Sequence, residues 1–206
     1  MPAPDHEGVP APRRRGRPGL DLAQVLAGSI EVFTERGYDG ASLDDLSRRL
    51  GISKSSIYHH VESKQALLGL ALDDALGGLE GAAQEVAAHD GPAVERLELL
   101  VRRSVAVLVE RLPSVTLLLR VRGNSVVEQR ALVRRRALDQ VAADLVARAV
   151  ADGELRPDLD PGVTARLVFG TVNSLTEWLT PSSTHDADAL ADAVVAVAVD
   201  GLRVRR

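Results

Sequence analysis

The sequence predicts an all-α protein, and three of its features lead to that fold class. Apolar residues recur at spacings of three and four along most of the chain, which is the period of one face of an α-helix. No stretch of any length alternates apolar and polar residues as a half-buried strand does. Breaks that contain glycine or proline separate the periodic segments, so the 206 residues divide into a series of helices.

The overall composition fits a globular protein of one or two domains. The chain is 45% hydrophobic, which is enough for a core, and it has no cysteine, so neither a disulfide framework nor a cysteine-based zinc site is possible. No apolar run approaches the roughly 18–20 residues of a membrane span, and the charged, proline-rich start is unlike a signal peptide. We therefore expect a cytoplasmic protein with no membrane partner. The net charge of −4 argues against indiscriminate nucleic-acid binding, so any DNA contact must come from locally placed charge.

Residues 1–18 are predicted to form a disordered basic arm. The first part is rich in proline and glycine, and the run RRRGRPG follows at positions 13–19. A flexible arginine-rich segment before a helical DNA-binding unit is typical of arms that enter the minor groove, where it would add affinity and salt dependence more than sequence choice. The alternative is a solvated tail. The arginines in question are Arg13, Arg14, Arg15 and Arg17.

Three short helices are predicted after the arm, the last two joined by a tight turn. The first spans 20–37, with apolar residues near 3.6-residue spacing. Ser42 is expected to cap the second helix, with Asp45 completing a capping box in which Asp replaces the usual Glu. Gly51 should end that helix, and Ser53 should cap the third. Two short helices crossed in this way fit a helix-turn-helix, whose second helix enters the DNA major groove.

The helix that would read DNA has one apolar and one polar side. Ile57 and Val61 lie four residues apart and predict its inward side. Lys54 and Lys64 are the only lysines in the chain, and each follows a serine cap in a first helical turn, where the helix dipole disfavours a cation by roughly 0.3–1 kcal/mol. That placement is explained if a phosphate docks there; the alternative is two exposed lysines without function. The outward residues are Lys54, Ser55, Ser56, Tyr58, His59 and His60.

A family resemblance covers residues 20–70, and its matching features lie in the run LAGSIEVFTERGYDGASLDDLSRRLGISKSSIYHHVESKQALLGLAL, at positions 26–72. This run closely resembles the DNA-binding domain of the TetR family of one-component bacterial regulators. The resemblance also implies a homodimer and a ligand-responsive, all-helical second domain, with the helix-turn-helix domain over 19–65 and the second domain over 66–206. By position, it implies that bases face Lys54, Ser55, Tyr58 and His59, and that phosphates lie nearer Ser42, Ser56, His60 and Lys64.

The second domain is predicted to consist of six helices. They span 63–88, 93–111, 113–122, 125–151, 162–179 and 186–204. The first of them links the two domains, and three glycines weaken it, each by about 1 kcal/mol relative to alanine. Those glycines, Gly77, Gly78 and Gly81, allow either a hinge or close helix packing, and we favour packing.

The last two helices are the expected dimer surface. One carries a stripe of Val168, Thr171, Leu175 and Trp178, and the other a stripe of Leu190, Val194, Val197 and Gly201. Two such pairs from two subunits could form a four-helix bundle, although an ordinary intrachain core explains the same pattern. A homodimer would present two reading helices about 34 Å apart, which predicts a pseudo-palindromic operator.

Several polar residues are embedded in apolar parts of the second domain. Buried polar groups cost free energy unless they are paired, so such residues could line a cavity for a small-molecule effector; intrachain ion pairs and solvated faces are the alternative. The segments VRGNSVVEQRALVRRR and GELRPDLDPGVTARLVFGTVNSLTEWLTP resemble those of family members that respond to acyl-CoA thioesters. A drug-responsive repressor of a transporter is the second possibility. The candidate ligand residues are Arg120, Asn124, Glu128, Asn173, Glu177 and Trp178.

Other function classes find little support in the sequence. It contains no P-loop, no G-x-G-x-x-G after a strand and no H-E-x-x-H, and its histidines show no metal-ligand spacing. We therefore expect no catalytic residues, no metal and no cofactor. An architectural protein that binds A/T-rich DNA through the arginine arm is a further alternative. The favoured hypothesis is a dimeric repressor that a small molecule releases from its operator.

Overall fold

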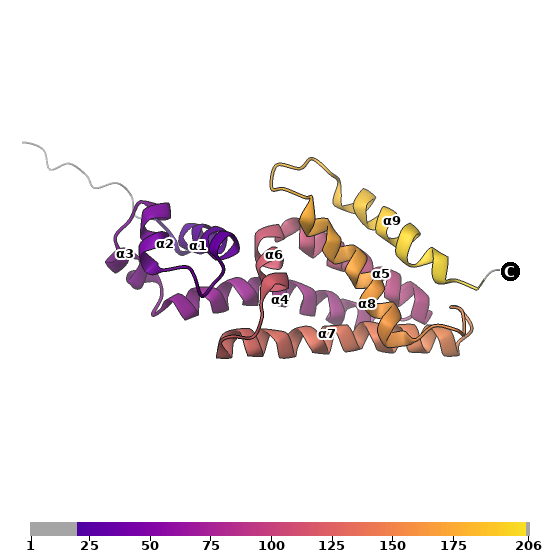
Figure 1. Ribbon diagram of the computed structural model, residues 1–206. Coiled ribbons are helices and arrows are strands. Elements are labelled where there is room, and N and C mark those ends of the chain that lie inside the picture. Colours follow the sequence, from indigo (N-terminus) through magenta and orange to yellow (C-terminus); the bar gives the residue numbers. More distant parts are fainter. Residues whose placement is uncertain (1–19, 205–206) are drawn as a thin grey trace, which may run out of the picture.

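The computed structural model describes residues 20–204, and within that range the chain folds into nine α-helices (Figure 1). The described part has no β-strand, only an isolated bridge between Leu155 and Arg203, so the all-α prediction is confirmed. The helices are α1 (Leu22–Arg36), α2 (Leu43–Leu50), α3 (Lys54–His60), α4 (Lys64–Ala88), α5 (Ala93–Glu110), α6 (Leu112–Arg120), α7 (Val126–Ala151), α8 (Pro161–Ser174) and α9 (Ala187–Ala198).

Helices α1, α2 and α3 form a small unit at one end of an elongated molecule (Figure 1). Its core contains Phe33, Leu46 and Ile57, which are almost completely buried. Gly28 lets α1 approach α2 closely, because a Cβ added there would lie only 2.4 Å from Cδ2 of Leu50. Burial of these apolar faces orients the three helices relative to one another.

The predicted caps of the helix-turn-helix are confirmed. The Ser42 hydroxyl accepts the backbone N–H of Asp45, whose carboxylate accepts the N–H of Ser42 at 2.9 Å. Gly51 ends α2 in the left-handed conformation at φ 65°, where a side chain would be strained. Ser53 accepts the N–H of Ser56 at 3.1 Å and begins α3. Local sequence therefore sets the angle between α2 and α3.

Helix α4 begins beneath α3 and runs along the rest of the molecule (Figure 1). Of its three mid-helix glycines, Gly78 is required for packing, because an added Cβ would lie 2.8 Å from Cγ1 of Val107 on α5. A Cβ at Gly77 or Gly81 would meet nothing within 4 Å. Close packing therefore accounts for one glycine only, and α4 remains an uninterrupted helix.

Helices α5 to α9 pack with α4 into the larger unit. Arg134 of α7 forms ion pairs with Glu80 and Asp73 of α4, which join these two long helices. The hydrogen bond from Arg134 is the main cause of a lowered pKa at Glu80. These pairs are part of the intrachain alternative that the sequence left open for its arginines.

The last two predicted helices end earlier than expected. Helix α8 tightens after Ser174 into a single 3-10 turn over Leu175–Glu177. Helix α9 stops at Ala198, because the chain beyond it pairs with the α7–α8 connection. There the N–H of Arg156 donates to Leu202 O at 3.0 Å, and the N–H of Val204 donates to Glu154 O.

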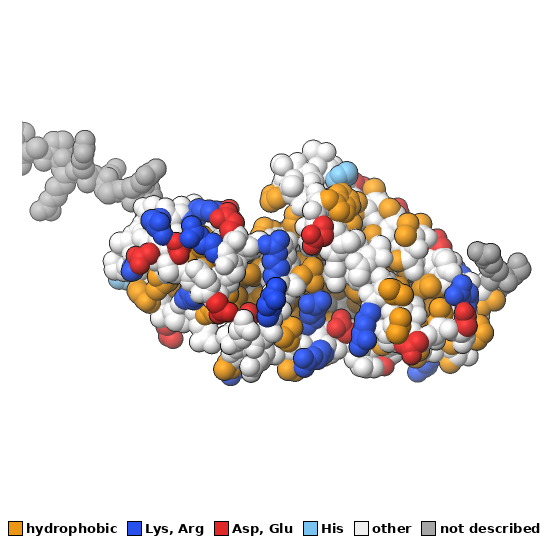
Figure 2. Space-filling model, in the orientation of Figure 1, with side chains coloured by type: hydrophobic (Ala, Val, Ile, Leu, Met, Phe, Trp, Pro, Cys, Tyr) orange, Lys and Arg blue, Asp and Glu red, His pale blue; other side chains and the backbone are white. Residues whose placement is uncertain are grey.

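The apolar stripes of the last two helices divide between the core and the surface. Val168, Leu175 and Val194 are buried inside this chain. On the outer side, large apolar side chains remain exposed at Val163, Leu167, Trp178 and Val197. Figure 2 shows hydrophobic side chains over this part of the molecule. The intrachain explanation therefore holds for the buried residues, and the dimer surface remains a prediction for the exposed ones.

Between residues 20 and 204, no helix has both the length and the apolar content needed to cross a membrane.

Candidate nucleic-acid interface

Helix α3 turns its polar side away from the protein. Ile57 has no exposed surface and Val61 is buried, so this side fixes the helix to the core. Tyr58 is 51% exposed, and Lys54, Ser55 and His59 are also exposed, whereas Ser56 and His60 are half-buried. The four residues assigned to bases by position thus share the outward side. The two half-buried residues lie nearer the edge, as residues beside a phosphate backbone would.

The N-terminus of α3 carries a cluster of hydroxyl groups. The Ser53 hydroxyl lies 2.8 Å from that of Ser55 and 2.9 Å from that of Ser56. Hydroxyls can act as both donor and acceptor, so these side chains can reorient towards phosphate or base edges without leaving a buried polar group unpaired.

Lys54 forms an ion pair in the absence of DNA. Its Nζ lies 2.8 Å from a carboxylate oxygen of Asp44 on α2. The side chains of Lys54 and Asp44 are 49% and 66% exposed. Exposed pairs of this kind contribute little to stability, about 0–1 kcal/mol. Lys54 can therefore exchange Asp44 for a phosphate or a base at small cost.

Ser42 is engaged in the cap of α2. Its hydroxyl donates to Asp45 Oδ2 at 2.6 Å, while Arg36 and Arg48 approach the other oxygen of Asp45. The hydrogen bonds from the Ser42 side chain and backbone are the largest causes of the lowered pKa of Asp45, and the two arginine charges add to them. A phosphate at this point would meet Arg48, whose side chain is 72% exposed.

Sequence reasoning missed Arg36 and Arg48 as candidate phosphate contacts. Both lie beside Ser42, but in the sequence they stand among acidic residues and look like ordinary solvated helix positions. Figure 2 shows lysine and arginine side chains interspersed with acidic ones over the α1–α3 end. This surface therefore differs from the rest of the protein in where its basic side chains lie, and not in an excess of basic over acidic residues.

The assignment of Lys64 to a phosphate does not fit the structure. Its ammonium group donates to the carbonyl oxygens of Tyr38 and Ala41 at 2.9 and 2.8 Å and lies 4.2 Å from the centre of the Tyr38 ring. Lys64 thereby holds the start of α4 against the α1–α2 connection. Its position in the first turn of α4 follows from these internal acceptors, so no bound anion is needed to explain it.

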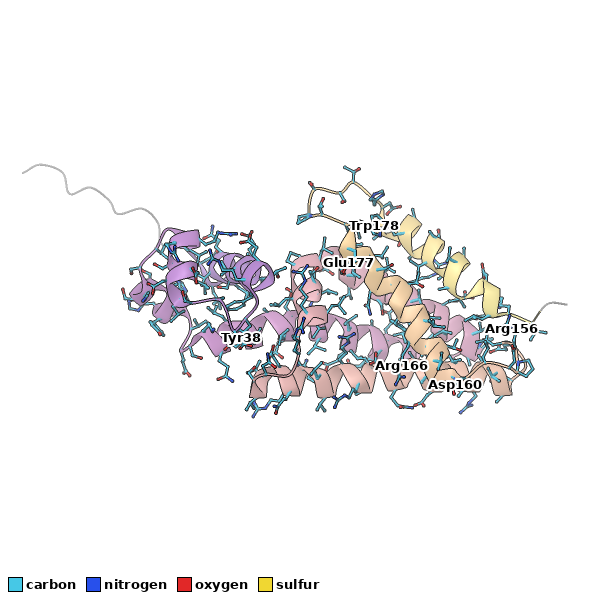
Figure 3. The ribbon with its side chains drawn as sticks, in the orientation of Figure 1. Tyr38, Arg156, Asp160, Arg166, Glu177 and Trp178 are labelled. Atoms are coloured by element: carbon cyan, nitrogen blue, oxygen red, sulfur yellow. The ribbon has the colours of Figure 1, made fainter. Side chains whose placement is uncertain are left out.

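The predicted ligand residues do not share one cavity. Arg120 donates to the carbonyl oxygen of Thr34 at the end of α1, and Asn124 donates to Asp39 beyond α1, both at 2.8 Å. Glu128, which is 5% exposed, forms a capping box at the start of α7 with Ser125. Arg120 and Glu128 line a small cavity together with Tyr38, where the second unit meets the helix-turn-helix unit; Tyr38 is labelled in Figure 3.

The other predicted ligand residues are also dispersed. Glu177 and Trp178 lie at the far end of α8 (Figure 3), where both side chains are exposed and Trp178 packs edge-on against His185. Only Asn173 lines the apolar cavity enclosed by α4, α5, α6, α7 and α8. Sequence patterns could not locate this cavity, because its wall combines residues from five helices.

The arginines at positions 13, 14, 15 and 17 lie outside the described residues, so their predicted contact with the minor groove remains an expectation.

Comparison with known proteins covers both units. Residues 25–71 match the family of bacterial regulatory proteins called tetR, and residues 90–202 match the tetracyclin repressor-like C-terminal domain. The HTH-type transcriptional repressor KstR2 of Mycolicibacterium smegmatis is 28% identical over 203 residues, which are 97% of this chain and 95% of the relative.

Two solved structures extend the likeness. SCO3833, a TetR-family member from Streptomyces coelicolor A3, is 48% identical with a TM-score of 0.80, covering 87% of this chain and 91% of that one. AibR in complex with isovaleryl coenzyme A and operator DNA has a TM-score of 0.70 at 23% identity, covering 85% and 96% of the two chains, and so shows a shared fold.

A helix-turn-helix with an exposed polar reading helix, joined to a larger helical unit, defines a DNA-binding transcription regulator. The proteins it resembles are regulators and not enzymes. This chain belongs to the TetR family of bacterial transcriptional regulators.

Proposed function

We propose that this chain is a repressor that binds a pseudo-palindromic operator as a homodimer and leaves it when a small molecule binds the second domain. The observation that carries the proposal is the outward side of α3, where Lys54, Ser55, Tyr58 and His59 are exposed together on a helix fixed by buried Ile57. A helix held in this way can enter the major groove as a rigid body. A protein that binds operators in chromosomal DNA would be located in the cytoplasm.

The outer side of α8 and α9 supports the homodimer. Leu167 and Val197 are 68% and 76% exposed, and Val163 and Trp178 are both 51% exposed. Large apolar side chains grouped on neighbouring helices are a common feature of protein–protein interfaces. Two copies joined there would form a four-helix bundle and set the distance between the two α3 helices.

The ligand-responsive part of the proposal is supported by the cavity and by the relatives. The AibR structure contains an acyl-CoA ligand together with operator DNA, which supports an acyl-CoA thioester as the ligand class for a chain of the same fold. A ligand shifts the equilibrium only if it prefers the conformation that does not bind DNA. Helix α4, which begins directly after α3 and forms part of the cavity wall, would transmit that preference.

Selection of binding sites from random duplex DNA, followed by footprinting, tests this function. We expect a short symmetric protected site with two half-sites, and repression of a reporter placed behind that site. An architectural protein would instead coat A/T-rich DNA without defined borders. Failure to select any sequence would contradict the proposed function.

A further inference from the structure

A groove lies between the helix-turn-helix unit and the larger unit, where α1 packs beside α6 (Figure 1). Its volume is about 440 Å³, which is in the size range of binding clefts. Leu26 and Ile30 of α1 and Pro113 of α6 supply apolar surface. The lining residues of α1 run from Ala23 to Glu31, so the groove follows this helix for about two turns.

Acidic side chains outnumber basic ones in the wall of this groove. Among the described residues that line it, three are acidic, Glu31, Asp74 and Glu110, and one is basic, Arg111. The guanidinium group of Arg111 lies 3.3 Å from Asp74 and 4.0 Å from Glu110, so two carboxylates share one cation. Glu31 and Glu110 are 58% and 70% exposed. The groove therefore attracts a cationic partner.

A buried serine adds an unpaired hydroxyl to the same groove. Ser114 is only 4% exposed, and its hydroxyl forms no hydrogen bond with any residue between 20 and 204. The neighbouring Thr116, by contrast, donates to the carbonyl oxygen of Leu112 at 2.7 Å. A buried hydroxyl without a partner is unfavourable, so a bound group that donates N–H bonds would be stabilised here.

The basic arm before α1 has the chemistry that this groove accepts. Its arginines, at positions 13, 14, 15 and 17, precede Leu20, where the described residues begin. A guanidinium group donates several N–H bonds to carboxylate or hydroxyl oxygens, and its aliphatic stem packs on apolar surface. The arm and the groove are therefore complementary in charge, in hydrogen bonding and in apolar contact.

The arm is also long enough to reach the groove of its own chain. An extended chain covers about 3.3 Å per residue, so residues 13–19 span about 23 Å. Helix α1 rises only about 12 Å between Ala23 and Glu31, at about 1.5 Å per residue. The Pro18-Gly19 pair is typical of turns, which would let the arm reverse direction and run back along α1.

We propose that, in the protein without DNA, the arginines of the basic arm dock in this acidic groove of their own chain. Arginines held by the carboxylates are not available to DNA phosphates, so the groove and the DNA compete for one segment. The contact is therefore autoinhibitory. Its effect on operator binding rests on the proposed function, whereas the docking itself does not.

Methyl NMR of the full chain without DNA tests where the arm lies. The spectrum of the unaltered chain is compared with that of a variant in which all four arm arginines are replaced by glutamine. We expect shift changes at Ala27 and Ile30, which line the groove, and none at Ala87 and Ala147, which are exposed in the second unit. Changes confined to other surfaces, or no change at Ala27 and Ile30, would refute the docking.

Trypsin cleavage of the arm provides the residue-level test. A docked arginine cannot enter the protease site, so the cleavage rate follows the fraction of undocked arm. The double substitution Glu31→Gln and Glu110→Gln should speed cleavage after the arm arginines by about threefold or more, because it removes two exposed charge contacts.

The matched control removes two other exposed glutamates, Glu35 and Glu85, by substitution with glutamine. Glu35 lies on α1 and shares Arg49 with Glu31, and neither Glu35 nor Glu85 lines the groove. The control should be cleaved like the unaltered chain, and both double variants should keep its thermal unfolding. Equal cleavage rates for the groove variant and the control would contradict the proposal.

The outcomes separate this inference from the proposed function. Docking without any selectable operator would refute the repressor and leave the groove contact in place. Operator binding together with unchanged NMR shifts and cleavage rates would refute the groove contact and leave the repressor. Where both hold, the groove variant should bind the selected operator about threefold more tightly than the control does. Arginine amide serves as the probe of a diffusible cation: if it shifts Ala27 and Ile30 while the arm variant does not, the arm is not the occupant.

Discussion

At the scale of single residues, the proposed contact of Lys54 with DNA would require that its ion pair with Asp44 be broken. Asp44 lies in the first turn of α2, beside the N-terminus of α3, and its charge faces the same side as the expected phosphates. A carboxylate there competes for the lysine and repels the DNA backbone. In the free protein, Lys54, which is the only lysine on α3, is therefore held in a weak ion pair with Asp44.

Replacing Asp44 with Asn should strengthen operator binding by about two- to fivefold, which is the range that an exposed ion pair of up to 1 kcal/mol allows. The difference should shrink as salt is added, because screening weakens both the pair and the repulsion. Fluorescence anisotropy at several salt concentrations measures it. Asp73→Asn, which alters an acidic residue on α4 far from α3, serves as the control; weaker binding by Asp44→Asn would contradict the assigned role.

Tyr58 supplies the largest exposed side chain on the reading helix. Tyr58→Ala should lower operator affinity by about tenfold or more, as expected for loss of a side chain that contacts bases. Thermal unfolding should change little, because the residue is half exposed and packs against little else. Glu62→Ala, at an exposed position just after α3, is the matched control. Equal operator affinities for Tyr58→Ala and the unaltered chain would show that this face of α3 does not contact DNA.

At the scale of elements, α6 lies between the cavity and the helix-turn-helix unit. Val115, Leu118 and Leu119 line the cavity, and Arg120 in the last turn donates to the carbonyl oxygen of Thr34 at the end of α1. A ligand that displaces α6 by a small amount would therefore alter the contact that fixes the end of α1. The residues expected to bind a ligand at this point instead join the two units.

Arg120→Ala should uncouple ligand binding from DNA release. The ligand affinity and the DNA affinity, each measured separately, should stay within about threefold of those of the unaltered chain. The factor by which the ligand weakens DNA binding should fall by about fivefold or more, which is within the usual range of coupling free energies. Arg122→Ala is the control, because Arg122 is exposed and forms no ion pair within the described range. An unchanged coupling factor in Arg120→Ala would exclude this route.

Local patterns predicted the elements well, because caps and apolar periodicity act within a few residues. Ser42, Gly51 and Ser53 mark helix ends through bonds to their own neighbours. The internal acceptors of Lys64 and the partners of Arg120 come from residues more than twenty positions away, and no local pattern specifies them.

At the scale of the whole molecule, the proposed recognition of a two-half-site operator would depend on two copies of this chain. A single α3 reads only one half-site, and the outer side of α8 and α9 is the apolar surface that would fix the distance to the second one. The two proposed roles thus fall on different parts of the molecule. The proposed DNA contact lies on α1–α3 at one end, and the proposed dimer surface lies on the last two helices (Figure 1).

The double substitution Leu167→Asp and Val197→Asp should convert the dimer to a monomer, because it introduces charges that the apposed copy would have to bury without partners. Light scattering measures the mass, and affinity for a two-half-site duplex should fall to that for a single half-site. Val133→Asp alters an equally exposed apolar residue on α7 and should leave the dimer intact. A double variant that remains dimeric would place the interface elsewhere.

The most direct test of the account is the structure of this chain bound to its selected operator. The account predicts α3 in the major groove of each half-site, with Tyr58 and His59 within hydrogen-bonding or van der Waals distance of base edges and Lys54 released from Asp44. A complex in which the outward side of α3 faces solvent, or in which another surface fills the major groove, would contradict it.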